Sequence, residues 1–212
     1  MQYAHEQKVI HRDIKPGNVL VNEAGSPKLL DFGIAKVLNP ELSTGTVNPA
    51  TVTGLMTPQY ASPEQVRGEP ITPATDVYAL GLVLYKLLTG KLPYALHSSD
   101  PAQVARIICD TEPSRPSAQV MEADAESRGD SAASLRRRLS GDLDNIVLKA
   151  LRKEPERRYA SAAELSDDVE RYLADRPVRA RPDSLQYRAA KLARRNRPTM
   201  IAAAGGIFAV IL

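Results

Sequence analysis

His11-Arg12-Asp13-Ile14-Lys15-Pro16-Gly17-Asn18 is the stretch from which the interpretation of the chain starts, because it places an acid, a lysine and an amide on one short segment. The Pro16-Gly17 pair within it is typical of a turn, so the polar side chains are expected on a loop. The runs Val19-Leu20-Val21 and Lys28-Leu29-Leu30 follow, separated by a polar turn. This spacing predicts a short antiparallel hairpin directly after the loop.

Two further motifs come after the first. Asp31-Phe32-Gly33 begins 13 residues after Asn18, and Ser62-Pro63-Glu64 lies in a long stretch rich in Thr, Pro and Gly. Each motif alone is weak evidence, but their order, their spacing and the hairpin between the first two form a specific pattern. From Met1 to about Leu173 the chain resembles the C-terminal lobe of a protein kinase. It is most similar to bacterial, eukaryote-like serine/threonine kinases that carry a transmembrane helix after the kinase domain.

The resemblance implies a serine/threonine protein kinase, which transfers the γ-phosphoryl group of ATP to Ser and Thr hydroxyls of protein substrates. Asp13 then orients the attacking hydroxyl or accepts its proton, and Lys15 neutralises the transferring group and contacts ATP. Asn18 and Asp31 are the implied ligands of Mg²⁺, which prefers a few hard oxygen ligands completed by phosphate and water. The implied cofactors are therefore ATP and Mg²⁺.

Other positions match structural or regulatory residues of the family, namely His11, Arg12, Phe32, Gly33, Thr51, Thr53, Thr57, Glu64, Asp76 and Arg158. Arg12 beside Asp13 resembles the kinases in which a cationic pocket binds a phosphate on the activation loop. Thr51 and Thr53 lie where such kinases carry their activating threonines. Thr57 matches the threonine that contacts the catalytic Asp and selects Ser/Thr substrates.

The resemblance also implies contacts that hold the fold together. Glu64 is expected to pair with Arg158, although 94 positions separate them in the sequence. Asp76 is expected to hold the backbone of the His11-Arg12 segment.

The body of the chain, residues 1–174, is expected to be mainly α-helical with one small β-hairpin, as in the C-lobe of the protein-kinase fold (α+β). Residues 76–89 are apolar on nearly every side, which predicts a buried helix. A half-buried helix is expected from residue 143, and a capping box at residue 161 predicts another. Isolated His5 is expected at the surface, and Cys109 in the core.

The C-terminal part of the chain differs in charge from the body. Residues 171–212 carry nine Lys and Arg against two acids, while the whole chain has a formal net charge of +3. The body is therefore net negative, which disfavours nucleic acid as a partner. Residues 175–198 are expected to form a basic juxtamembrane linker.

Residues 199–212 are uncharged and apolar, but a membrane-spanning helix needs about 20 residues. They are expected to begin a truncated transmembrane helix, with a buried core helix as the alternative. Arg194, Arg195 and Arg197 just before it predict a single-pass protein of the inner (plasma) membrane with its kinase side in the cytoplasm. Whether a full-length kinase of this kind dimerises is left open.

Neither G-x-G-x-x-G nor V-A-I-K, the motifs that cover and bind the ATP phosphates in kinases, occurs before His11. The N-lobe is therefore expected to be absent, the chain truncated at both ends, and the 212 residues alone inactive. A non-catalytic, membrane-bound kinase-like module or an inert fragment is the alternative function. A small-molecule phosphotransferase of the aminoglycoside-kinase type is a third, disfavoured by the long loop before Glu64, which is a protein-substrate feature.

Overall fold

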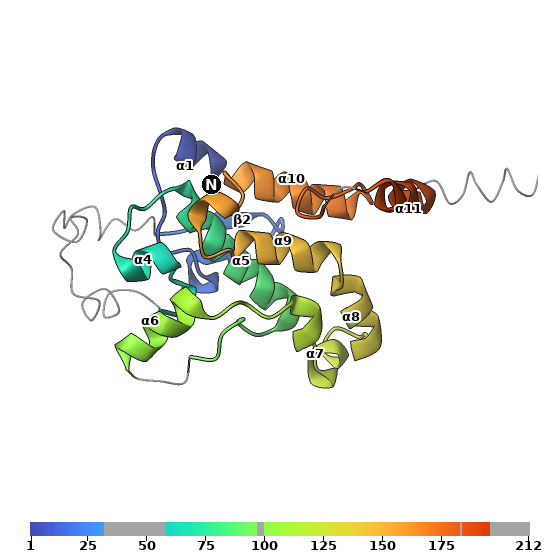
Figure 1. The fold of residues 1–212 in the computed structure, drawn as a ribbon, viewed down its shortest axis with the longest axis horizontal. Coiled ribbons are helices and arrows are strands. Elements are labelled where there is room, and N and C mark those ends of the chain that lie inside the picture. Colours follow the sequence, from blue (N-terminus) through green and yellow to red (C-terminus); the bar gives the residue numbers. More distant parts are fainter. Residues whose placement is uncertain (32–57, 97–99, 183, 196–212) are drawn as a thin grey trace, which may run out of the picture.

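The computed structural model describes residues 1–31, 58–96, 100–182 and 184–195, and it is mainly helical with one two-stranded sheet (Figure 1). This agrees with the fold class expected from the sequence. Predictions for Phe32, Gly33, Thr51, Thr53 and Thr57, and for residues 199–212, lie outside the described residues.

The N-terminal part contains the loop and the hairpin. Helix α1 spans Gln2–Glu6, a single 3-10 turn covers Pro16–Asn18, and strands β1 (Val19–Val21) and β2 (Pro27–Leu29) pair antiparallel. In the turn between the strands, the Oδ1 atom of Asn22 accepts a hydrogen bond from the Ser26 N–H at 2.8 Å. The predicted hairpin is thus present, and it follows the loop directly.

Helix α5 (Pro73–Thr89) is the centre of the molecule. It lies against α9 (Asp142–Ala150) and α10 (Ala162–Leu173), so its side chains are buried on several faces, as its apolar sequence predicts. A Cβ atom at Gly81 would lie 2.9 Å from the Cβ atom of Ala150, a distance at which one helix would have to shift. A glycine at this position therefore permits the close approach of α5 and α9.

The other elements surround this centre. They are η3 (Pro58–Tyr60), α4 (Pro63–Arg67), α6 (Pro101–Asp110), η4 (Pro116–Gln119), α7 (Glu122–Glu126), α8 (Ala132–Leu139), η5 (Pro155–Arg157) and α11 (Leu185–Arg195). Helix α4 begins with a capping box, in which the Ser62 hydroxyl accepts from the Gln65 N–H while the Gln65 side chain accepts from the Ser62 N–H.

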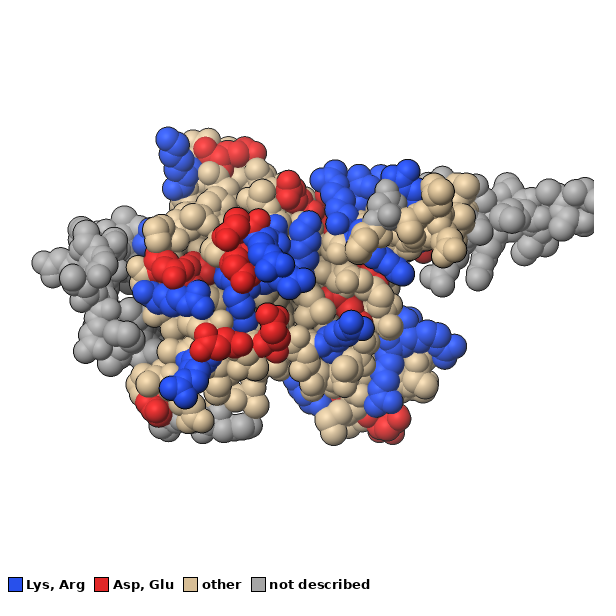
Figure 2. Space-filling model, viewed as in Figure 1, with Lys and Arg blue, Asp and Glu red and all other residues tan. Residues whose placement is uncertain are grey.

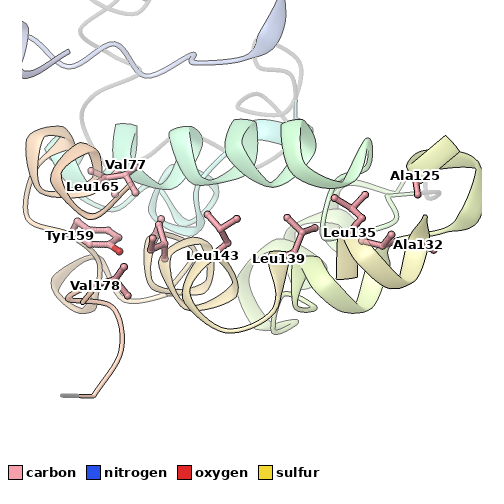
Figure 3. Close-up of a cluster of buried hydrophobic side chains, with 12 residues drawn as sticks. Val77, Ala125, Ala132, Leu135, Leu139, Leu143, Tyr159, Leu165 and Val178 are labelled. Carbon is pink, nitrogen blue, oxygen red and sulfur yellow. The ribbon is translucent and has the colours of Figure 1, made fainter. Parts of the chain in front are cut away.

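The main apolar core lies between α5 and the helices that cover it. Figure 3 shows Val77 of α5 together with Leu143, Leu139 and Leu135 in a row along α9 and α8, and Leu165 from α10 at one end. A second cluster around Tyr78, Tyr85 and Leu151 fills the other side of α5. The burial of apolar side chains is the dominant stabilising contribution in a folded domain. The core fixes α5, whose N-terminal end carries Asp76.

The described part of the segment that is expected to form a basic juxtamembrane linker packs against the helical body. Val178 and Tyr187 are less than a tenth exposed, and α11 occupies residues 185–195. The buried carboxylate of Asp168 on α10 accepts hydrogen bonds from the backbone N–H groups of Arg179 and Ala180, at 2.5 and 2.8 Å. In the described residues 175–182 and 184–195, the groups that bind this basic segment include the buried acids Asp142 on α9 and Asp168 on α10.

Within the described part of the chain, none of the helices combines the length and the apolar character that crossing a bilayer requires.

Candidate active site

The imidazole of His11 connects the loop to the end of the hairpin. The ring is fully buried; its Nδ1 atom lies 3.3 Å from the Asp13 N–H nitrogen, and its Nε2 atom lies 2.9 Å from the Leu30 carbonyl oxygen. A backbone N–H needs an acceptor and a carbonyl needs a donor, so the ring proton sits on Nε2. His11 thereby fixes the loop to the residue that precedes Asp31.

Asp13, Lys15 and Asn18 form one polar group at the loop. Lys15 Nζ lies 2.9 Å from Asp13 Oδ2, and both side chains are 28% exposed. The Asn18 amide nitrogen donates to the Asp13 carbonyl oxygen at 2.8 Å and to Asp13 Oδ2 at 3.1 Å. Because the amide nitrogen is used in this way, the amide oxygen is the atom of Asn18 that can bind a cation. The carboxylate of Asp13 is held in place yet remains open to solvent.

Asp31 is the second residue after the hairpin, and it is exposed. The Leu30 N–H donates to the Asn18 carbonyl oxygen at 2.8 Å, so the backbone before Asp31 is bound to the backbone of Asn18. An amide oxygen and a carboxylate are hard donors of the kind that Mg²⁺ takes, so the donor chemistry of this pair fits the implied ion. Among the described residues no group of three or more His, Cys, Asp or Glu side chains could hold a metal on its own.

The backbone at Arg12 and Asp31 is strained, with φ angles of 70° and 52° in the left-handed region that non-glycine residues rarely adopt. The buried carboxylate of Asp76 accepts from the N–H groups of His11 and Arg12, both at 2.9 Å. The Gln65 amide nitrogen donates to the Arg12 carbonyl oxygen at 2.8 Å. The peptide groups around Arg12 are therefore bound from both α5 and α4, which maintains the strained conformation.

Two members of this arrangement, His5 and Gln65, are not among the residues that the family resemblance indicates. His5, expected at the surface, is buried: its side chain is 4% exposed, and its Nε2 atom lies 2.8 Å from Asp76 Oδ2. Gln65 is the second: its side-chain oxygen completes the capping box of α4, and its amide nitrogen donates to the Arg12 carbonyl oxygen. The capping box can be recognised in the sequence from Ser62 and Gln65. No sequence pattern indicates the contact of His5 with Asp76.

Glu64 and Arg158, expected as partners, form a bidentate ion pair. Both N–O distances are 2.7 Å, and both side chains are at most 1% exposed. Thr75 also donates to Glu64 at 2.8 Å. Burial alone would raise the pKa of the Glu64 carboxyl, but the bonds from Arg158 and Thr75 outweigh it and lower the pKa. The pair connects α4 with the segment after α9.

Lys153 lies beside this pair and was not singled out by the sequence. Its ammonium group donates to the Tyr94 hydroxyl at 2.8 Å and to the Ile108 carbonyl oxygen at 2.5 Å, and it lies 4.4 Å from the centre of the Tyr94 ring. Burial lowers the pKa of Lys153 to about 8. Cys109 nearby is buried, as expected, and burial raises the pKa of its thiol.

The Lys153 environment predicts a pH-dependent stability. Between about pH 8 and the ordinary pKa of 10.5, the unfolded chain binds more protons at this site than the folded one, so stability rises with pH there. A Lys153→Met variant lacks this dependence. We therefore expect its stability relative to the native chain to be most favourable below pH 8 and to decline towards pH 10.5, by at most about 1.4 kcal/mol per pH unit.

Urea unfolding at a series of pH values measures this difference. The exposed Lys28 on β2 provides the control. A Lys28→Met variant should differ from the native chain by the same amount at every pH. A constant difference for Lys153→Met as well would contradict the assignment of a depressed lysine pKa.

Comparisons with known proteins identify the family to which the chain belongs. The model of the protein kinase domain matches residues 1–169. The chain is 37% identical over 180 residues to serine/threonine-protein kinase PknB of Mycobacterium tuberculosis, covering 85% of this chain and 25% of that protein. It is 39% identical over 170 residues to a probable serine/threonine-protein kinase of Corynebacterium efficiens, covering 80% of this chain and 23% of the relative.

Among solved structures, the PknI kinase domain of Mycobacterium tuberculosis is similar, with a TM-score of 0.49 and 24% identity over 81% of this chain and 49% of that one. The chain spans about a quarter of the length of the curated relatives it matches. The matched region includes the loop, both helices that hold it, and the Glu64–Arg158 pair. The chain belongs to the protein kinase domain family, with bacterial serine/threonine kinases among its relatives.

Proposed function

We propose that this chain carries the catalytic loop and the metal-binding residues of a serine/threonine protein kinase, which transfers the γ-phosphoryl group of ATP to protein Ser or Thr hydroxyls. The observation that supports this most directly is the Asp13–Lys15–Asn18 group. It joins an accessible carboxylate, a cation 2.9 Å away and an amide that orients the carboxylate. Phosphoryl transfer needs these parts, because catalysis depends mainly on positioning and charge balance.

Each residue has a defined part in the proposed reaction. Asp13 Oδ1 or Oδ2 accepts the hydrogen bond of the substrate hydroxyl and takes its proton as the oxygen attacks. Lys15, already beside Asp13, places a positive charge where the transferred group gains negative charge. Asn18 and Asp31 would hold Mg²⁺, which when bound with ATP supplies charge neutralisation at the phosphate oxygens.

Two parts of the proposal concern residues outside the described ranges. We propose that phosphorylation of Thr51 or Thr53 activates the kinase through a cationic pocket that includes Arg12, and that Thr57 contacts Asp13. We also propose attachment of residues 199–212 to the inner membrane, with the helical body in the cytoplasm. The apolar sequence and the arginines before it support this part.

The alternative is a non-catalytic module or an inert fragment. No G-x-G-x-x-G loop and no V-A-I-K lysine occur before His11, so the phosphate-covering contacts would have to come from residues outside 1–212. Large apolar side chains are also exposed on the hairpin itself, where Leu20 and Val21 of β1 are 56% and 65% exposed.

We predict that residues 1–212 alone transfer no measurable phosphate from ATP to a Ser/Thr peptide. The same chain extended upstream by a kinase N-lobe should turn over at a rate within the usual range of about 1–100 per second. The measurement is ³²P transfer with Mg²⁺ present, to peptides that differ only in Ser, Thr or Tyr at the acceptor position. Inactivity of the extended protein, folded and able to bind ATP, would favour the non-catalytic alternative.

A further inference from the structure

Helix α11 has two different faces. Leu185, Ala189 and Leu192 are exposed and, at spacings of four and three residues, share one side of the helix, its outward face. The two leucines are 85% and 52% exposed. Tyr187 and Lys191 lie on the opposite side and are less than a tenth exposed. The helix therefore packs against the protein with one side and presents apolar side chains to solvent with the other.

Polar contacts of the inner side fix the rotation of α11. Lys191 Nζ lies 2.8 Å from Asp142 Oδ2 at the start of α9, and both side chains are less than a tenth exposed. The Tyr187 hydroxyl accepts from the Val178 N–H at 3.0 Å, and the Arg181 guanidinium lies over the Tyr187 ring at 4.6 Å. The leucines cannot turn inward without breaking these contacts, so their exposure is a property of the fold.

The charge of α11 indicates what its outward face meets. Figure 1 shows the helix at one end of the molecule, beyond α10, and Figure 2 shows Lys and Arg side chains gathered near the junction of these two helices. A basic helix with exposed leucines is typical of segments that lie at a membrane surface. A second copy of the chain is a poorer partner, because two basic helices would bring like charges together. The helix contains four cations and no acid, the cations being Arg188, Lys191, Arg194 and Arg195.

The chain after α11 connects it closely to an apolar segment. The helix ends at Arg195, and the uncharged residues 199–212 follow. The chain from Arg195 to Thr199 spans at most about 14 Å when fully extended. Attachment of residues 199–212 to the membrane therefore keeps the end of α11 within about that distance of its surface. A soluble acidic protein has no comparable connection to the helix, so the membrane surface is the favoured partner.

We propose that the outward face of α11 lies in the interface of the inner membrane and thereby orients the helical body on it. Leu185 and Leu192 enter the boundary between headgroups and acyl chains, and the basic residues of the helix meet anionic headgroups. Because Tyr187 and Lys191 hold the same helix to the body, the body takes its orientation from α11. This inference rests on the proposed attachment of residues 199–212, but it concerns different residues.

Two cysteine variants of the whole 212-residue chain test this orientation. Ala189→Cys places a thiol on the outward face, and Ala190→Cys places one at the next residue, on the side that lines a groove shared with α8. Both positions are exposed, whereas the native Cys109 is buried and present in both variants. The measurement is the rate of reaction with a charged thiol reagent, with and without vesicles of phosphatidylcholine that contain about one third phosphatidylglycerol.

We expect vesicles to slow the reaction of the Ala189→Cys variant at least about tenfold, because burial of even one leucine favours the bound orientation by about that factor. The Ala190→Cys variant should keep most of its reactivity. Equal slowing of both variants would indicate that vesicles cover this whole end of the molecule, and would overturn the proposal. So would binding to vesicles that slows neither, because α11 would then stand away from the bilayer.

Substitution of the leucines tests their part directly. Adding Leu185→Gln and Leu192→Gln to the Ala189→Cys variant should restore rapid reaction in the presence of vesicles. Adding Leu87→Gln and Met121→Gln instead, which removes two exposed apolar side chains elsewhere, should leave the thiol protected. Equal effects of the two pairs would contradict a specific role of α11. If the first pair prevents folding, Leu185→Gln alone, at the more exposed position, replaces it.

Co-sedimentation with the same vesicles tests the proposed attachment separately. An Ile207→Asp/Ile211→Asp variant should bind more weakly than the native chain. Unchanged binding of this variant would contradict attachment by residues 199–212, while protection at position 189 would still support the outward face. Failure of the native chain to bind vesicles would contradict both proposals. Protection at position 189 that appears without vesicles, as the protein concentration rises, would assign the face to a second copy and overturn the inference.

Discussion

Replacing Asp13 by Asn in the chain extended by an N-lobe should lower kcat by about 10²- to 10⁴-fold, the usual contribution of a positioned acid–base group. The Asn amide has nearly the same shape, but its nitrogen cannot accept a proton from the substrate hydroxyl. It would also face the Asn18 amide nitrogen and the Lys15 ammonium group, which lie 3.1 and 2.9 Å from Asp13 Oδ2 and are donors themselves.

The comparison of kcat with KM distinguishes a catalytic from a structural effect. The KM for ATP should change little, because Asp13 acts on the hydroxyl and not on the nucleotide. A Glu23→Gln variant is the control, since it changes an exposed acid in the turn of the same hairpin. It should keep kcat within twofold or so of the native protein. A kcat for Asp13→Asn within tenfold of the native value would exclude Asp13 as the catalytic base.

Replacing Arg158 by Met should lower the free energy of unfolding by about 3–5 kcal/mol, because it leaves the Glu64 carboxylate buried without its partner. The guanidinium also donates to three backbone carbonyl groups, those of Arg152, Lys153 and Ala74, which would lose a hydrogen bond each. Urea unfolding followed by circular dichroism measures the loss. Against an overall stability of about 5–15 kcal/mol, this change is large enough to unfold part of the population.

Two further variants test whether the uncompensated buried charge causes this loss of stability. Glu64→Gln combined with Arg158→Met should be more stable than Arg158→Met alone, because the uncompensated charge is removed. Arg157→Met, at a neighbouring side chain that is 59% exposed, should change stability by no more than about 0.5 kcal/mol. If the double variant is no more stable than Arg158→Met alone, the loss comes from the backbone hydrogen bonds and not from the buried charge.

The Glu64–Arg158 pair also predicts a response to acid. The pKa of Glu64 is lower in the folded chain than its ordinary value of 4.5, so the pair stabilises the fold fully above that value. The contribution is lost as the pH falls through the folded-state pKa. The Arg158→Met variant should therefore differ less from the native chain in acid than at neutral pH.

Several features of the site were predictable from the sequence because they depend on local spacing or on a motif. The turn at Pro16-Gly17 and the alternating runs beside it predict the loop and the hairpin, and both are present. The apolar sequence from residue 76 predicts the buried α5. The pairing of Glu64 with Arg158 followed from the family pattern, and the two side chains meet across 94 positions.

The tertiary structure alone decided the contacts that no local pattern encodes. His5 looked like a surface residue because its neighbours in sequence are polar, yet α5 brings Asp76 to within 2.8 Å of it. The segment after residue 175 looked like a linker because it is basic and poor in apolar residues. Its partners Asp142 and Asp168 lie on helices whose sequences predict only that they are amphipathic. Periodicity determines which face of a helix is buried, whereas the packing of the helices determines which charges meet on it.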